Sequence, residues 1–131
     1  KLSVAEVIPF FKYTKEDVVL IACLASEEES KDPIDLAVIN YANSLGIDFS
    51  SYKWVSFTPF NPTIKRSEAV VEGKGIRFKA VKGAPQIILD LCKNASEIRQ
   101  EVGKVLEELS HKGYRTLAVA RSEGEDFDRS A

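Results

Sequence analysis

A β-hairpin signal near the centre of the sequence constrains the fold more than any other feature. Gly73-Lys74-Gly75 separates two runs that are typical of β-strands, at residues 67–72 and 76–82. Two such runs on either side of a short glycine-rich segment predict antiparallel strands joined by a tight turn. A chain with this hairpin must build at least part of its sheet from antiparallel neighbours.

The hairpin would place two unusual segments side by side. Residues 57–66 contain two aromatics and two prolines and lead into its first strand, while residues 81–85 close its second strand. Phe60, Lys65 and Lys82 can then lie near one another. Taken singly, Phe60 could be a core residue and each lysine a surface charge. Together, a flat ring between two lysines would form a seat for a base that carries phosphates.

The rest of the sequence predicts a mixture of helices and strands. Alternating or apolar runs predict further strands at residues 2–10, 52–57 and 116–120. Helical periods and caps predict four helices, the first after Thr14 with an apolar run at residues 18–25, and the others at residues 33–45, 85–92 and 97–112. Strands joined by hairpins, with the helices set apart, predict an α+β fold with a mainly antiparallel β-sheet flanked by helices. No internal repeat or linker interrupts residues 1–131, so we expect a single domain.

Residue types at the helix ends support these assignments. Thr14 followed by Asp17 is typical of a capping box, although aspartate replaces the usual glutamate. Asp32 followed by Pro33 is a typical helix start. Ser96 is expected to cap the last helix.

Composition limits the classes of function. The chain has 18 Lys and Arg against 20 Asp and Glu, a formal net charge of −2, so no excess of positive charge favours nucleic-acid binding. No apolar run approaches the roughly 18 residues that a membrane-spanning helix requires, and we expect no direct membrane contact. The sequence contains no methionine, so we expect an excised fragment or a processed chain.

Few residues could build a metal site or a nucleophilic centre. Cys23 and Cys92 each lie in an apolar stretch and are expected to be buried reduced thiols, with a disulfide between them left open. Glu27-Glu28-Glu29 is expected to be a solvated loop, and His111 a surface residue near a helix end. Asp126-Phe127-Asp128 follows a polar segment, which argues against a catalytic role. With one histidine and two cysteines, we expect no metal site.

Five short segments carry a more specific pattern. The first two are Lys1-Leu2-Ser3-Val4 and Asp32-Pro33-Ile34-Asp35-Leu36-Ala37. The other three are Phe57-Thr58-Pro59-Phe60-Asn61-Pro62-Thr63-Ile64-Lys65-Arg66, Val81-Lys82-Gly83-Ala84-Pro85 and Gly113-Tyr114-Arg115-Thr116-Leu117-Ala118-Val119-Ala120. In this order they resemble the nucleotide-binding domain of P-type cation-transporting ATPases, and the third is similar to the proton-pump branch. Gln86 departs from that family, which has glutamate after the proline.

The resemblance implies a pocket for the adenine of ATP. Phe60 would stack on the base. Lys65 and Lys82 would line the pocket, with Lys82 deep within it. Gly83 and Ala84 would let the backbone approach the base.

The same resemblance implies that this chain would bind the nucleotide while another part of a pump accepts the phosphoryl group. Asp35 would accept a hydrogen bond from the adenine amino group, and Arg115 would meet the phosphates. The cofactor would be ATP, as Mg-ATP in the intact pump. The aspartate that accepts the phosphoryl group would precede Lys1, so we expect no catalytic residue in this chain. It would be a cytoplasmic domain that works with the phosphorylation and actuator domains of the same polypeptide.

Two other functions stay open at this point. A non-catalytic protein-interaction module would expose an apolar patch and would not respond to ATP. A self-sufficient phosphohydrolase would release phosphate steadily as the purified chain.

Overall fold

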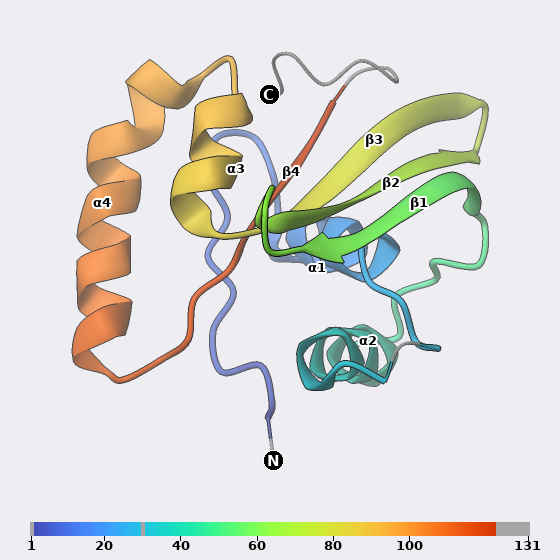
Figure 1. The fold of residues 1–131 in the computed structure, drawn as a ribbon, viewed down its shortest axis with the longest axis horizontal. Helices are drawn as coiled ribbons and strands as arrows, with labels where there is room; N and C mark the ends of the chain where they lie inside the picture. The colour runs from blue at the N-terminus through green and yellow to red at the C-terminus, as the bar shows by residue number, and fades with distance from the viewer. Residues whose placement is uncertain (1, 30, 123–131) are drawn as a thin grey trace.

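The computed structural model describes residues 2–29 and 31–122 and shows one sheet flanked by helices (Figure 1). The four strands pair antiparallel in the order β1-β2-β3-β4. In chain order the elements are α1 (Lys15–Leu24), α2 (Pro33–Ser44), β1 (Lys53–Asn61), β2 (Arg66–Gly73), β3 (Ile76–Gly83), α3 (Pro85–Leu91), α4 (Ala95–His111) and β4 (Ala118–Arg121). The predicted α+β class and the single domain are confirmed.

The central hairpin forms as predicted. β2 and β3 pair in unbroken register from the turn after Gly73 to the pair formed by Arg66 and Gly83. Lys74 and Gly75 both have positive φ, 50° and 78°. Positive φ at both central residues gives the turn that matches the twist of the two strands. The motif segments that flank the hairpin therefore meet at the end of the sheet opposite this turn.

β1 is longer than predicted and runs into the motif stretch. The sequence predicts a strand at residues 52–57, whereas the strand continues to Asn61. Its register against β2 shifts before Ser56 and again before Asn61. β1 lies at the edge of the sheet, and eight of its nine residues are exposed.

The strand predicted at residues 2–10 is not formed. Residues 2–10 have no regular secondary structure, and the one backbone–backbone hydrogen bond found for them runs from Tyr13 N–H to the carbonyl of Phe10. A strand needs a partner for its amides, and alternation of apolar residues alone does not supply one. Glu6 instead accepts from Lys112 Nζ at 2.8 Å, which ties the segment to the end of α4.

The helix starts follow the capping residues, with one exception. Thr14 Oγ1 accepts from Asp17 N–H at 3.1 Å while the Asp17 carboxylate accepts from Thr14 N–H at 3.0 Å, which confirms the capping box. The cap predicted at Ser96 is wrong. Asn94 occupies the N-cap position of α4, and a bond from Ala95 N–H to Cys92 O links this start to the end of α3. The helix therefore begins at Ala95, before the predicted start at residue 97, and Ser96 lies inside its first turn.

The core has a layer on each face of the sheet. On one face, α1 packs on alternate residues of β2 and β3 in a cluster of Ile21, Leu24, Ala25, Ala69, Val71, Phe78 and Ala80. On the other face, α3 packs in a cluster of Val81, Ile88, Cys92 and Ala120. Val81 and Ala80 point to opposite faces because side chains alternate along a strand. A third cluster joins α1 to α2 through Val19, Cys23, Ile39 and Ala42.

The two cysteines are buried free thiols, as predicted. Cys23 lies in α1 on the side that packs against α2, and Cys92 follows the last residue of α3, so the two belong to different clusters of the core. Burial raises the pKa of the Cys23 thiol from its ordinary value of 9.0 to about 12, and the charge of Glu28 acts in the same direction. Cys23 is therefore held as a neutral thiol and is a poor nucleophile.

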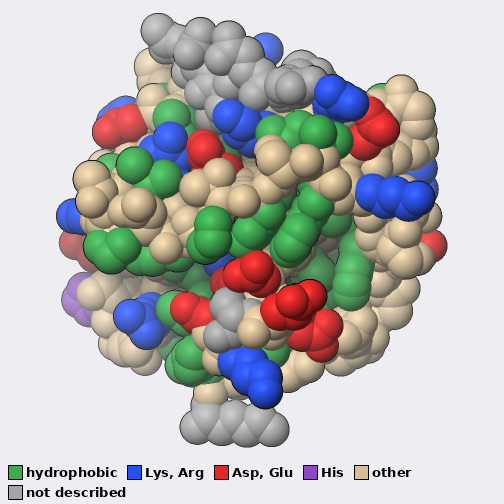
Figure 2. Space-filling view, turned by 45° about the vertical axis from the view of Figure 1, so that its right-hand side comes forward, with side chains coloured by type: hydrophobic (Ala, Val, Ile, Leu, Met, Phe, Trp, Pro, Cys, Tyr) green, Lys and Arg blue, Asp and Glu red, His purple; other side chains and the backbone are tan. Residues whose placement is uncertain are grey.

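Charges are mixed over the surface that Figure 2 shows. Basic side chains there are scattered, whereas acidic side chains gather beneath a band of hydrophobic ones. Among residues 2–29 and 31–122, none of the helices has both the length and the apolar character to cross a bilayer. Asp126-Phe127-Asp128 lies outside the described residues.

Candidate functional site

The segments singled out in the sequence meet at one end of the sheet. Asn61 at the end of β1 pairs with Arg66 at the start of β2. Arg66 in turn pairs with Gly83 at the end of β3, and Gly83 pairs with Ala118 at the start of β4. One rung of the sheet therefore crosses three of the five motif segments.

Gly83 brings two motif segments into direct backbone contact. A Cβ atom at this position would overlap the carbonyl oxygen of Lys65 and would lie 2.8 Å from Cα of Arg66. The next residue, Ala84, donates its N–H to the same Lys65 carbonyl at 3.2 Å. Only glycine allows this approach, so the predicted proximity of residues 57–66 and 81–85 is confirmed.

Asn61 shapes the turn that carries Lys65, a role that the sequence analysis missed. The Asn61 side chain accepts from Thr63 N–H at 2.7 Å, and its backbone carbonyl accepts from Lys65 N–H at 2.6 Å. Lys65 has φ of 59°, and its side chain is exposed. An asparagine beside a proline is a common turn signal that could have revealed this role.

Phe60 is an exposed aromatic ring at the end of β1. Its residue is 55% exposed, and it takes part in none of the ring contacts found among the described residues. Earlier in the same strand, Trp54 and Phe57 stack on each other with centroids 4.3 Å apart. The Trp54 indole also donates to Leu24 O at 2.9 Å. Those two rings are structural, whereas Phe60 is open to a planar ligand.

Lys82 and Asp35 form a buried ion pair. Lys82 Nζ lies 2.8 Å from Asp35 Oδ1, and the side chains are only 6% and 13% exposed. Asp35 Oδ2 accepts from Glu27 N–H at 2.9 Å. A buried ammonium group is costly unless it is paired, which explains why these charges meet. The contact was not predicted.

The start of α2 and a bond from β2 position this pair. Asp32 caps α2 by accepting from the N–H groups of Ile34 and Asp35, at 2.8 and 3.4 Å. Across the sheet, Ser67 lies opposite Lys82, and its buried hydroxyl donates to Ala25 O at 2.8 Å. These bonds hold the end of α1, the start of α2 and the end of β3 together.

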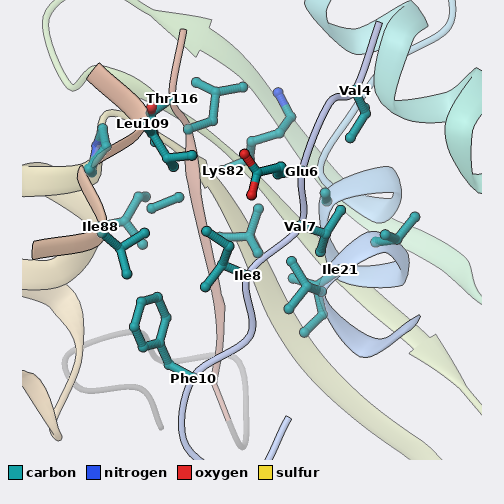
Figure 3. A pocket seen from close by; sticks show the side chains of 18 of the residues that line it. Val4, Glu6, Val7, Ile8, Phe10, Ile21, Lys82, Ile88, Leu109 and Thr116 are labelled. Carbon is teal, nitrogen blue, oxygen red and sulfur yellow. The ribbon is translucent and has the colours of Figure 1, made fainter. Parts of the chain in front are cut away.

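A cavity of about 660 Å³ lies beside this end of the sheet. Figure 3 shows Val4, Val7 and Ile8 of the N-terminal segment around it, together with Ile21 and Ile88 from the helices on the two faces. Lys82 and Arg115 line the cavity, whereas Asp35, Phe60, Lys65, Gly83 and Ala84 do not. Lys82 therefore lines the cavity, as Arg115 does, and is also paired with Asp35, which does not line it.

Arg115 stands between α4 and β4. It lies three residues before Ala118, which pairs with Gly83, and its residue is exposed. Of the other predicted site residues, Lys82 is the one that lines the same cavity as Arg115. In the described part of the chain, no group of three or more His, Cys, Asp or Glu side chains could hold a metal ion.

Comparison with known proteins gives a consistent result. A family described as P-type ATPase, cytoplasmic domain N, matches residues 21–130. A protein of Methanocaldococcus jannaschii named "Putative cation-transporting ATPase" is 47% identical over 122 residues, which cover 92% of this chain and 15% of that protein. A Dictyostelium discoideum protein named "Probable plasma membrane ATPase" is 41% identical over 124 residues, which cover 92% of this chain and 12% of that protein. The chain therefore spans less than a sixth of the length of these relatives.

Proposed function

This chain belongs to the family of P-type ATPase cytoplasmic N domains, and from this we propose that it binds ATP and delivers the γ-phosphate to the phosphorylation domain of a cation pump. Residues 1–131 of this chain would form one domain of a longer polypeptide, in which the phosphorylation and actuator domains are its partners. The similarity of residues 57–66 to the proton-pump branch favours a proton as the cation.

The contact between Gly83 and Lys65 carries this proposal. It joins two motif segments, and it leaves Phe60 exposed at the same end of the sheet. We assign adenine stacking to Phe60, and we assign the walls of the pocket to Lys65 and Lys82. Gly83 and Ala84 would let the base approach the backbone at this end of the sheet.

The remaining two residues would complete the site. Arg115 would meet the phosphates, since a guanidinium group pairs well with phosphate oxygens. Asp35 would lie at the adenine pocket beside Lys82, with which it forms an ion pair. Magnesium would arrive with ATP in the intact pump.

Simple energetics predict weak binding. Stacking on an aromatic ring contributes roughly 1–3 kcal/mol, and a charge-assisted hydrogen bond about 1.5–3 kcal/mol. One stacking contact and two or three such hydrogen bonds, less an association cost on the order of 4 kcal/mol or more, leave roughly 4 kcal/mol, which is a roughly millimolar dissociation constant. Weak binding suits a domain that must release its nucleotide in every cycle.

Backbone amide shifts during titration with ATP test the proposal. We expect shifts around Phe60, Lys82 and Gly83, and we expect adenosine to reproduce much of this footprint. A spectrum unchanged by ATP would reject the proposal and favour a protein-interaction module. Equal competition by inorganic triphosphate would show that the adenine is not recognised. Steady phosphate release by the isolated chain would contradict the absence of a catalytic residue.

A further inference from the structure

We propose that Asp35 is a positioning residue, which fixes the ammonium group of Lys82 for the nucleotide and does not itself read the adenine amino group. This inference rests on the proposed nucleotide site and concerns how that site is built. The resemblance implies a direct contact between Asp35 and adenine, whereas the geometry points to an action through Lys82.

Both carboxylate oxygens of Asp35 are already engaged. Oδ1 accepts from Lys82 Nζ at 2.8 Å and Oδ2 accepts from Glu27 N–H at 2.9 Å. The Asp35 side chain is 13% exposed. Each carboxylate oxygen can accept a second hydrogen bond, but Lys82 lines the cavity beside the sheet and Asp35 does not, so a neutral adenine amino group would meet the ammonium group first. Charge-assisted hydrogen bonds are roughly twice as strong as neutral ones, so the ammonium group should keep its place.

Lys82 needs such a partner in order to present its charge in a fixed direction. A lysine side chain has four rotatable carbon bonds and is usually mobile. Here its backbone is fixed by pairing with Ser67 on one side and Val119 on the other, and its Nζ is fixed by Asp35. One of its three donors points to Asp35, which leaves two for a ligand. A group that is ordered before the ligand arrives costs less entropy on binding.

Asp35 is itself held from two sides. Its backbone N–H lies in the first turn of α2 and donates to the Asp32 cap at 3.4 Å. Its Oδ2 is held by the backbone of Glu27, on the loop that joins α1 to α2. The carboxylate is therefore a rigid support for Lys82.

The two roles predict different purine selectivity. Inosine triphosphate lacks the amino group of ATP but retains the ring and the phosphates. If Asp35 positions Lys82, the substitution Asp35→Asn weakens the binding of ATP and of inosine triphosphate by the same factor, which we expect to be about fivefold to tenfold. If Asp35 contacts the amino group, the substitution weakens ATP more and changes the ratio of the two affinities.

A double-mutant cycle completes the test. Affinities for both nucleotides are measured by amide shifts in the wild type, Asp35→Asn, Lys82→Met and the double variant. We expect Asp35→Asn to have no further effect in the Lys82→Met background, because there is then no ammonium group to position. An effect that persists in that background, or a changed ratio of the two affinities, would overturn the inference.

Controls separate this inference from the function on which it rests. Asp90→Asn removes an exposed ion pair with Arg99 and should leave both affinities unchanged. If the wild type itself shows no shift with ATP, the proposed function fails, and the positioning role fails with it. If the wild type binds and the ratio changes in Asp35→Asn, only the positioning role fails. Should Asp35→Asn not fold, Asp35→Glu keeps the charge but moves the carboxylate, and the same equal weakening is expected.

Discussion

The ammonium group of Lys82 lies 2.8 Å from Oδ1 of Asp35, although 47 residues separate the two in the sequence. The pair joins the end of β3 to the first turn of α2. Lys82→Met should destabilise the fold by about 3–5 kcal/mol, because it leaves a carboxylate largely buried without its partner. Adding Asp35→Asn should recover part of this loss. Urea unfolding of the three variants measures both effects, and a double variant less stable than Lys82→Met would contradict the account.

Phe60 should matter for binding and not for folding. The residue is 55% exposed and has no ring partner among the described residues, so Phe60→Ala should change the free energy of unfolding by about 0.5 kcal/mol or less. The same change should weaken ATP binding by about 1–3 kcal/mol through lost stacking. Phe57→Ala is the matched control, since it removes a packed ring and should lower stability. Unaltered ATP affinity in Phe60→Ala would show that the base stacks elsewhere.

Gly83→Ala should lower stability by about 1–3 kcal/mol, because the new methyl group would meet the backbone of Lys65 and Arg66. Gly103→Ala is the contrasting control. A Cβ at Gly103 would meet nothing within 4 Å, and alanine favours the helix, so that change should stabilise α4 by about 0.4–1 kcal/mol. Chemical denaturation measures both variants. Equal effects of the two substitutions would mean that the close approach at Gly83 is not retained in solution.

Arg115 should contribute to the binding of the phosphates of ATP and not to the binding of its adenosine part. The residue is exposed and precedes β4, so Arg115→Gln should leave stability within about 0.5 kcal/mol of the wild type. ATP affinity should fall by about 1.5–3 kcal/mol, the contribution of a hydrogen bond to a charged group. Adenosine affinity should stay the same. Amide-shift titrations with both ligands measure the difference, and a parallel loss of adenosine binding would contradict a phosphate contact.

Stability should fall at alkaline pH through Cys23. Burial raises the pKa of this thiol in the folded state from 9.0 to about 12, so the folded chain keeps a proton that the unfolded chain loses. The contribution is complete below pH 9 and is lost as the pH rises towards 12, at up to about 1.4 kcal/mol per pH unit. Cys23→Ala should show a shallower decline in this window. Identical pH profiles for the two proteins would exclude this contribution.

The hairpin, the capping box and the α2 start could be predicted because each depends on neighbours in the sequence. Gly75 allows the turn, and Thr14 and Asp17 cap the helix three residues apart. The convergence of residues 57–66 and 81–85 followed from the hairpin register. These features are local, or follow from one local feature.

The features that could not be predicted depend on distant partners. The alternation in residues 2–10 is typical of a strand, but in the described structure the segment does not pair with either edge strand of the sheet, β1 or β4. The partner of Asp35 is fixed by how α2 packs on α1, which no pattern in residues 32–37 reveals. Ser96 has the right chemistry for a cap, yet the short link after α3 sets the helix start at Ala95.

The β2–β3 hairpin has its turn at one end and the contact between Gly83 and Lys65 at the other. Ile76 and Arg77 beside the turn are exposed and lie beyond the pairing with β4, which reaches only residues 80–83. Gly83 is buried and has a paired strand on each side. Slow exchange of amide protons should then mark the ligand end of the hairpin, and faster exchange the turn end. The nucleotide would therefore bind a part of the sheet whose backbone is already ordered in the free protein.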